Sequence, residues 1–198
     1  MNTLDAIRTR KSVRKFQDAP IPAECITRIL QAGMEAPSTK NSQPWKYYVL
    51  QGAAKYKLSK LMQEGLNSFG DAESIKQLPF YGSVIGTIRT IETAPAVILV
   101  FNTGIHTLNS PGSLESRFMD CGAMQTMGAT IQNMLLAATE QGLGSLWMCD
   151  VYFAYEQICG WLGESAQLAA GIALGYPANE IAKPQRHDLN KHTIFMED

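Results

Sequence analysis

The stretch from Phe118 to about Gln141 restricts the possible folds of this chain more than any other part of it. Apolar residues recur there at helical spacing, and many positions between them are small, such as Gly122, Ala123 and Gly128. A helix that is apolar or small on nearly all of its faces must be buried. The sequence therefore predicts one long central helix, whose methionines fill the core.

Two other segments are apolar throughout and have the length of strands. Residues 96–101 and 168–175 predict strands that are buried on both faces of a sheet. Shorter strands are expected at 46–50 and 145–149. The glycines within residues 142–144 should end the long helix, because glycine accepts the left-handed backbone of a helix cap.

Shorter helices should accompany these strands. Thr3 can cap a first helix whose apolar face holds Leu4 and Ile7. Further helices are expected from Pro22 or Ala23 to before Pro37, over 53–66 and over 155–162, with 67–94 irregular except for one short helix. The exposed side of the helix over 53–66 should carry Lys55, Lys57, Lys60 and Glu64.

The composition fits one globular domain spanning residues 1–198. Charged residues make up 18% of the chain, below the roughly 25% typical of soluble domains, which favours an oligomer with hidden surface. No segment approaches the roughly 20 uninterrupted apolar residues of a membrane span, and no apolar signal region is present, so a cytosolic location is expected. A pI near 6.3 gives no general reason to expect nucleic-acid binding.

The cysteines and histidines do not form a metal-binding pattern. The cysteines show no short paired spacing, and the histidines do not stand at ligand intervals from them; these residues are Cys25, Cys121, Cys149, Cys159, His106, His187 and His192. Neither a zinc site nor a disulfide framework is expected. His106 falls in an expected loop over 102–114 and is interpreted as a surface histidine.

A basic run at residues 10–14 reads Arg-Lys-Ser-Val-Arg. From Met1 to Phe16 there are five cationic side chains against Asp5, a side-chain charge of +4 in a chain whose formal charge is −1. Three cations and a hydroxyl in five residues suit a bound anion. A solvated face or a frayed terminus is the alternative interpretation of the same run.

Two more polar segments resemble ordinary surface structure when they are considered alone. Prolines at both ends make residues 36–45 a loop rich in Ser, Asn and Gln, with Trp45 as a core anchor. The end of the chain is basic at 183–187 and again at 191–192, before the apolar residues Ile194 and Phe195. This end is either a solvated tail or a strand supplied to another subunit.

Taken in order, four motifs resemble the FMN-dependent nitroreductase family. They are the basic run at 10–14, the Pro-Ser-x-x-Asn-x-Gln-Pro-Trp loop at 37–45, the Gly-Leu-Gly-x-x-Trp element at 142–147, and Gly-Tyr-Pro at 175–177 followed by a basic tail. The resemblance runs from one end of the chain to the other. Residues 67–115 match no motif of the family, and members of the family vary their substrate lids there.

The resemblance implies an α+β sandwich, in which a mostly antiparallel central sheet is flanked by helices. It also implies an intertwined homodimer with two FMN sites at the interface. The long helix at 118–141 would then pack across the dimer, which agrees with its lack of a polar face, and the chain end at 194–195 would extend onto the partner.

The resemblance further implies roles for particular residues toward FMN. The phosphate would be held by Arg10, Lys11, Ser12 and Arg186, with Lys183 adding charge. Arg14 would contact the ring or the phosphate, or form a structural ion pair. The other subunit would supply Ser38, Thr39 and Asn41, and Gln43 would address the ring edge. The main chain of Leu146, Trp147, Met148 and Cys149 would approach the ring and donate hydrogen bonds to it.

The activity that the resemblance implies is carried by the flavin, so no catalytic side chain is assigned. FMN would accept hydride from NADH or NADPH and pass electrons, by ping-pong kinetics, to a nitroaromatic, a quinone or a similar acceptor. Two alternatives remain open. One is a specialised reaction on the same scaffold, such as reductive dehalogenation or flavin destruction, and the other is a flavin-binding sensor or storage protein.

Overall fold

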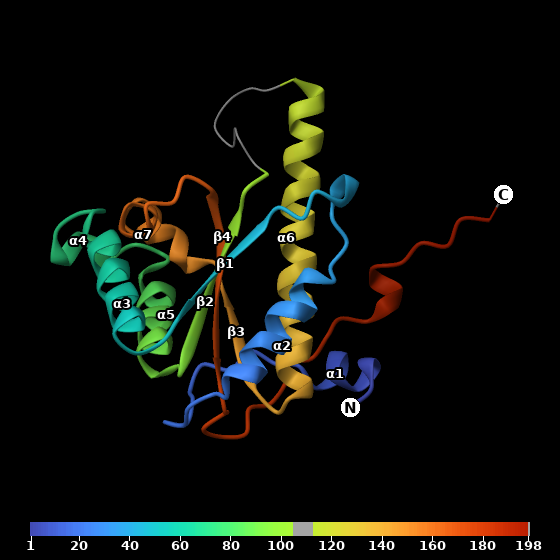
Figure 1. Cartoon of the computed structure of the whole chain (residues 1–198), viewed down its shortest axis with the longest axis horizontal. Helices are drawn as coiled ribbons and strands as arrows, with labels where there is room; N and C mark the ends of the chain where they lie inside the picture. The colour runs from blue at the N-terminus through green and yellow to red at the C-terminus, as the bar shows by residue number, and fades with distance from the viewer. Residues whose placement is uncertain (105–112, 198) are drawn as a thin grey trace.

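The computed structural model describes residues 1–104 and 113–197 of the chain (Figure 1). One antiparallel sheet lies at its centre, with the strand order β1-β2-β4-β3. The strands are β1 (Trp45–Leu50), β2 (Ala96–Asn102), β3 (Gly144–Met148) and β4 (Gln167–Gly175). The predicted α+β architecture with an antiparallel sheet is confirmed, and all the predicted strands are present.

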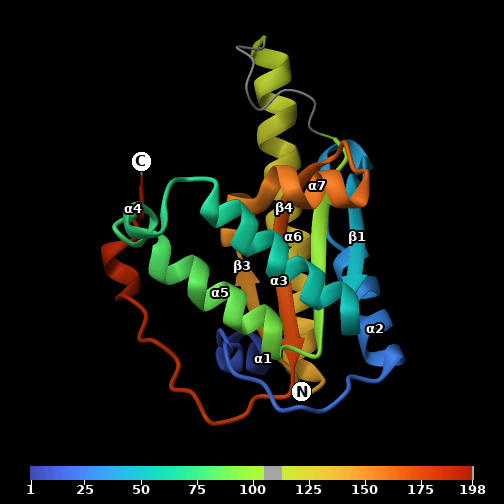
Figure 2. The same ribbon diagram turned by 90° about the vertical axis from the view of Figure 1, so that its left-hand side faces the viewer.

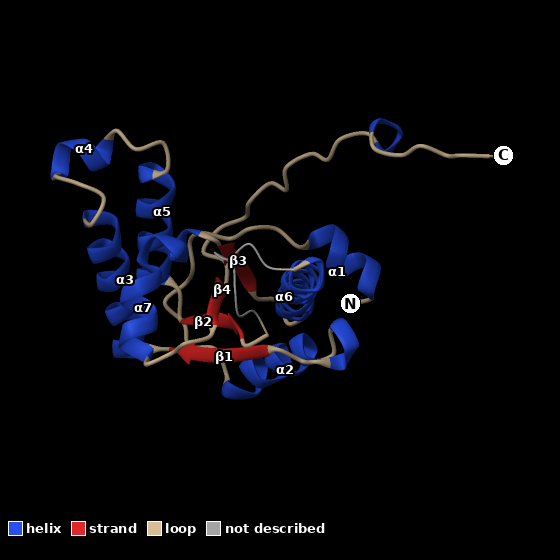
Figure 3. Cartoon of the chain, turned by 90° about the horizontal axis from the view of Figure 1, so that it is seen from above, coloured by secondary structure: helices blue, strands red, loops and turns tan. Residues whose placement is uncertain are grey.

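Helices cover both faces of the sheet (Figures 2 and 3). One layer contains α1 (Thr3–Thr9), α2 (Ala23–Met34) and α6 (Leu114–Glu140). The other contains α3 (Gly52–Asn67), α4 (Ala72–Lys76), α5 (Tyr81–Thr93) and α7 (Tyr155–Leu162). Short 3-10 turns occur at η1 (Thr39–Asn41), η2 (Asp150–Ala154) and η3 (Leu189–Lys191). No helix in the described part of the chain is long and apolar enough to cross a membrane.

Strand β2 supplies both hydrophobic cores, because successive side chains of a strand point to opposite faces. The core under α3, α5 and α7 receives Val97, Leu99 and Phe101. The core under α2 and α6 receives Ala96, Ile98 and Val100. Every residue of β2 is buried, as the apolar run at 96–101 predicts, and the polar Asn102 is buried with it. Burying each large apolar side chain in this way contributes roughly 1.5–3 kcal/mol.

Helix α6 ends as the glycine pattern predicts. Gly142 has a φ of +74°, in the left-handed region. Its N–H donates to the carbonyl of Thr139 at 3.0 Å, and the N–H of Leu143 donates to the carbonyl of Ala138 at 2.9 Å. This pair of bonds is the Schellman motif, which satisfies carbonyls at the helix end and turns the chain into β3.

The burial of α6 is not uniform. Its second half is buried against the sheet and α2, through Met127, Ile131 and Met134. Its first turns project beyond the sheet, and there Phe118 is 62% exposed and Met124 is 40% exposed (Figure 1). Within one chain the second half of α6 is buried on the side of the sheet and α2 and only half-buried on its other sides, so the prediction of a helix buried on nearly all sides is confirmed in part.

Two details of the predicted helices differ from the structure. Asn2 rather than Thr3 caps α1, since its side chain accepts the N–H of Asp5 at 2.9 Å. The region 67–94, where a single short helix was expected, contains both α4 and the 13-residue α5. The apolar face of α1, with Leu4 and Ile7, is exposed within this chain.

Lys55 is buried, although it was expected on the exposed side of α3, where Lys57, Lys60 and Glu64 do lie. Its ammonium donates to the carbonyl of Glu92 at 2.8 Å, in the last turn of α5. Burial lowers the pKa of Lys55, and the charges of Asp18 and Glu92 oppose that shift. A helix-end carbonyl thus explains how a lysine can occupy the interface between α3 and α5.

Glu164, just before β4, should stabilise the fold in a pH-dependent manner. Its carboxylate accepts hydrogen bonds from Tyr48 at 2.7 Å and from the N–H of Ala166 at 2.9 Å, and it pairs with Lys46 at 2.6 Å. These donors, Lys46 first, lower the pKa of Glu164 from 4.5 to about 2. The folded state therefore gains stability above the unfolded pKa and loses it as the pH falls toward 2.

We expect Glu164→Gln to lower the free energy of unfolding by about 1 kcal/mol at pH 7, a value reduced for the solvent exposure of Lys46. The difference from the parent protein should shrink below about pH 4.5, the ordinary pKa of this carboxyl. Urea unfolding of both proteins at pH 7 and at pH 3 measures it. An equal difference at both pH values would contradict the assignment.

Candidate functional site

The basic run is anchored along the outer edge of β3. The N–H of Val13 donates to the carbonyl of Ser145 at 2.9 Å, and Ser12 pairs with Ser145 as a parallel bridge. Val13 is 1% exposed and packs onto Gly144, where a Cβ would lie 2.7 Å from a methyl carbon of Val13. Glycine at 144 therefore permits this close approach. The basic run is a fixed part of the fold, not a frayed terminus.

The segment after β4 pairs with the residues that follow the basic run, and so brings the end of the chain close to that run. The N–H of Gln17 donates to the carbonyl of Tyr176 at 2.8 Å, and the N–H of Ala178 donates to the carbonyl of Lys15 at 3.0 Å. Further along, the ammonium of Lys183 donates to the carbonyls of Ile7 and Arg8, at 2.9 and 2.7 Å. Lys183 thus binds the end of α1, where helix carbonyls lack intrahelical partners.

These contacts collect positive charge. The pKa of Lys183 is lowered by partial loss of hydration and then by the charges of Arg10 and Arg186, so these three cations share one region. Within residues 1–104 and 113–197, the salt bridges join Lys46 to Glu164 and Lys76 to Glu73 only. The cations near Arg10 therefore have no carboxylate partner there, which suits an anion from outside the chain.

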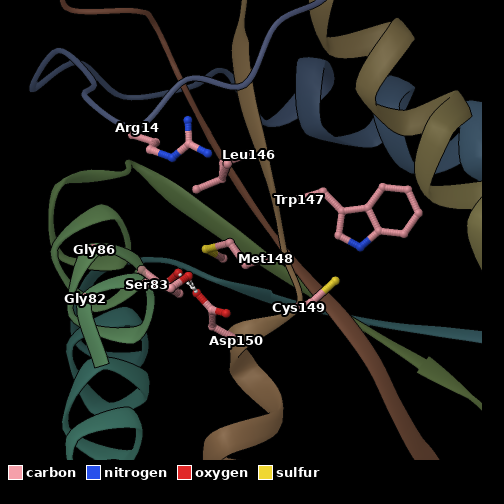
Figure 4. A pocket seen from close by; sticks show the side chains of 10 residues that line it. Arg14, Gly82, Ser83, Gly86, Leu146, Trp147, Met148, Cys149 and Asp150 are labelled. Carbon is pink, nitrogen blue, oxygen red and sulfur yellow. Dashed lines mark hydrogen bonds between the residues drawn. The ribbon is translucent and has the colours of Figure 1, made fainter. Parts of the chain in front are cut away.

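A cavity of about 430 Å³ lies between α5 and the outer edge of β3 (Figure 4). Its wall consists of Arg14, Gly82, Ser83, Gly86, Thr87 and the consecutive residues Leu146, Trp147, Met148, Cys149 and Asp150. Leu146 and Met148 point to the α5 side of β3, and Trp147 and Cys149 point to the other side (Figure 4). The predicted residues 146–149 and Arg14 are thus brought together.

The strand offers main-chain groups to this cavity. The carbonyl of Ser145 faces outward, because it accepts the N–H of Val13. Backbone groups alternate in direction along a strand, so the N–H and carbonyl of Trp147 face the same outer edge. Across the cavity, a Cβ added to Gly82 or Gly86 would meet no atom within 4 Å. The result is an open slot with hydrogen-bonding groups along one side.

Asp150 and two hydroxyls form the end of the cavity farthest from Arg14 (Figure 4). Ser83 and Thr87 each donate to Oδ2 of Asp150 at 2.7 Å. Burial, and then the charge of Asp150, raises the pKa of the neighbouring Cys149 thiol. Cys149 is therefore a neutral thiol near pH 7, which does not suit it to act as a nucleophile.

The loop at residues 38–43 lies elsewhere in the same chain. It packs against the first half of α6, where Thr39 lies so close to Gly122 that a Cβ would have no room. The N–H of Gln43 donates to the hydroxyl of Ser38 at 3.1 Å, and the side-chain amide of Gln43 donates to Asn41 at 3.4 Å. A second cavity of about 300 Å³ adjoins Ser38 and Thr39. Within one chain, Ser38, Thr39, Asn41 and Gln43 do not line the cavity beside β3.

Sequence reasoning missed the α5 side of the cavity, formed by Gly82, Ser83, Gly86 and Thr87, and it missed Asp150. A signal was present, because the two glycines and the two hydroxyl residues are each separated by four positions, which places each pair on one helix face. His106 lies outside the described residues. Among residues 1–104 and 113–197, no group of three or more His, Cys, Asp or Glu side chains could hold a metal ion.

The sequence matches known proteins along most of its length. The model of the Nitroreductase family matches residues 7–176. A protein of Methanothermobacter thermautotrophicus, named as an inferred NADH dehydrogenase/NAD(P)H nitroreductase, is 30% identical over 96% of this chain and 88% of its own length. The chloronitrobenzene nitroreductase of Comamonas testosteroni is 25% identical over 98% of this chain and 96% of its own length.

A solved structure shares the fold along the whole chain. The crystal structure of an inferred nitroreductase from Desulfovibrio desulfuricans, in complex with FMN, has a TM-score of 0.73 and 25% sequence identity. It covers 100% of this chain and 98% of that one. The predicted fold, with its antiparallel sheet between helix layers, is therefore confirmed. From the extent of these matches, the chain belongs to the nitroreductase family.

Proposed function

We propose that this protein is an FMN-dependent oxidoreductase that uses NADH or NADPH to reduce nitroaromatics, quinones or similar acceptors. The observation that carries the proposal is the cationic region at Arg10, which has no carboxylate partner among the described residues. The same basic run continues to Arg14, which lines the cavity along β3. The similarity of the chain to a nitroreductase and to a protein crystallised with FMN supports this cofactor and this reaction class.

The residues present fit the parts of FMN. A phosphate dianion requires cations and hydroxyl donors, which Arg10, Lys11, Ser12 and Arg186 would supply. Lys183 would act mainly by holding the chain end against α1, since two carbonyls already accept its hydrogen bonds. Arg14 and the outer edge of β3 would face the ring, because both line the slot.

Bound FMN would supply the redox chemistry, by accepting hydride from the nicotinamide and passing electrons to the second substrate. The residues of the chain would bind the flavin and orient it. The outward-facing N–H of Trp147 would donate to the ring edge, and the slot beside Gly82 and Gly86 leaves room for a flat group. The ping-pong order follows if donor and acceptor occupy the same space in turn.

The proposal includes a homodimer with FMN at the interface. Phe118 and Met124 expose apolar surface on the first half of α6, and Ile194 and Phe195 are 88% and 82% exposed on the extended chain end. Large exposed apolar groups of this kind mark protein interfaces. A second copy would cover them and bring residues 38–43 to the cavity, which they do not reach within one chain. A single domain and a cytosolic location are retained as expectations.

Anaerobic spectroscopy tests the proposed function. We expect NADPH or NADH to bleach the visible flavin band of the FMN-loaded protein, and a nitroaromatic or a quinone added afterwards to restore it. A flavin that stays oxidised with excess reductant would favour the sensor or storage alternative. Bleaching that only a halogenated aromatic reverses would favour the reductive dehalogenation alternative.

A further inference from the structure

Asp150 is a negatively charged group in the wall of a cavity that otherwise suits a flavin. It stands directly after β3, at the start of η2, and borders the slot beside Gly82 and Gly86. No cation pairs with its carboxylate within residues 1–104 and 113–197. A structural ion pair therefore does not account for its presence in that part of the chain.

The carboxylate of Asp150 is held in a fixed orientation. Ser83 and Thr87 lie one turn apart on α5, and both donate to the same oxygen, Oδ2, at 2.7 Å (Figure 4). No other hydrogen bond in the described part of the chain involves this carboxylate. Oδ1 is consequently available to accept a hydrogen bond from a group in the cavity.

The flavin ring has one hydrogen-bond donor that needs such an acceptor. In oxidised FMN, the edge of the pyrimidine ring presents two carbonyl oxygens with the imide N–H between them, and this is the only N–H of the ring. The cavity supplies the outward-facing Trp147 N–H as a donor for a carbonyl. Asp150 is the only carboxylate in the described wall of the cavity.

Resting on the proposed function, we infer that Asp150, oriented by Ser83 and Thr87, accepts the hydrogen bond of the flavin imide N–H. Asp150 is then a cofactor-binding residue with two consequences. It selects for an unsubstituted imide, and its charge disfavours the electron-rich reduced ring, so that oxidised FMN binds more tightly relative to reduced FMN.

An FMN analogue methylated at the imide nitrogen tests the hydrogen bond, because it lacks the donor. The wild-type protein should bind this analogue at least about tenfold more weakly than FMN, as expected for a lost charge-assisted hydrogen bond. Asp150→Ala should bind the two flavins with nearly equal affinity. Dissociation constants are measured from the quenching of flavin fluorescence, which requires no turnover.

Asp150→Asn tests the charge while keeping the shape. The dissociation constant of oxidised FMN, divided by that of reduced FMN, should rise about tenfold. For a two-electron couple, this change raises the reduction potential of the bound flavin by about 30 mV. Equilibration with a redox dye measures this potential. Glu156→Gln, which removes the charge of an exposed residue of α7 outside the cavity wall, is the matched control and should leave both measurements unchanged.

Two results overturn the inference alone. One is equal binding of FMN and its methylated analogue by the wild-type protein, and the other is unchanged tenfold discrimination in Asp150→Ala. Thermal unfolding without FMN shows whether a variant is folded. If Asp150→Ala fails to fold, the redox potential of Asp150→Asn replaces it as the test of the inference. Absence of FMN uptake by the wild-type protein would overturn this inference together with the proposed function.

Discussion

Replacing Arg10 by alanine should weaken the binding of FMN about 10- to 100-fold while changing the melting temperature of the FMN-free protein by less than about 2 °C. A hydrogen bond to a charged group is worth roughly 1.5–3 kcal/mol, and each 1.4 kcal/mol is a factor of ten in affinity. The main-chain bond by which Arg10 closes α1, from its N–H to Ala6, does not need the side chain. The side chain is therefore free to serve the ligand, and its loss should spare the fold.

Fluorescence titration with FMN measures this prediction, and two further variants interpret it. Arg28→Ala removes an exposed arginine from α2 and should bind FMN like the parent protein. Arg10→Lys should recover only part of the affinity, because an ammonium cannot form the two parallel bonds of a guanidinium fork. Equal affinity of Arg10→Ala and the parent would return the basic run to a solvated face.

Replacing Gly65 by alanine should lower the free energy of unfolding by about 3 kcal/mol, the upper part of the usual range for overpacking. At this position α3 crosses η2, and an added Cβ would overlap the carbonyl of Phe153 and stand 2.6 Å from Cα of Ala154. Neither atom belongs to a side chain that could rotate away. Helix α3 cannot retreat easily either, since Leu58 and Met62 are fully buried beneath it.

Gly160 provides the matched control for Gly65. It is an exposed glycine within α7, and an added Cβ there would meet nothing within 4 Å. Gly160→Ala should therefore raise stability by up to about 1 kcal/mol, the difference in helix propensity. Urea unfolding of both variants measures the contrast. A Gly65→Ala protein as stable as the parent would show that α3 and η2 do not meet as closely as described.

The Gly65→Ala substitution should also affect the candidate site. Because η2 begins at Asp150, a shift of η2 away from α3 would move one end of the cavity. We therefore expect Gly65→Ala to bind FMN more weakly as well, in contrast to Arg10→Ala, which should change binding without changing stability. Comparing the two variants separates residues that hold the ligand from residues that position the wall.

The elements of the fold that were predicted correctly depend on strong local patterns. The strand over 96–101 is apolar at every position because both of its faces enter a core, and few other structures permit such a run. Helix α6 was evident from its period, and its end from Gly142. The bounds of α5 could not be assigned because Gly82 and Gly86 lower helix propensity, whereas tertiary packing of Val84 and Ile88 stabilises the helix.

The candidate site was predictable where charge was concentrated in sequence and was missed where the site depends on tertiary contacts. The run at 10–14 and the cations near 183–186 could be recognised without a structure. Asp150 could not, because its partners Ser83 and Thr87 are more than sixty positions away and belong to a helix whose position was not predicted. Lys55 was misplaced for a similar reason, since the carbonyl of Glu92 that accepts its bond comes from α5.

An absorption spectrum shows whether this chain holds FMN beside the outer edge of β3. The purified protein is incubated with FMN, freed of unbound flavin by gel filtration, and scanned through the visible range. We expect a yellow protein that retains stoichiometric FMN with a flavin band. A colourless protein that takes up no FMN would contradict it.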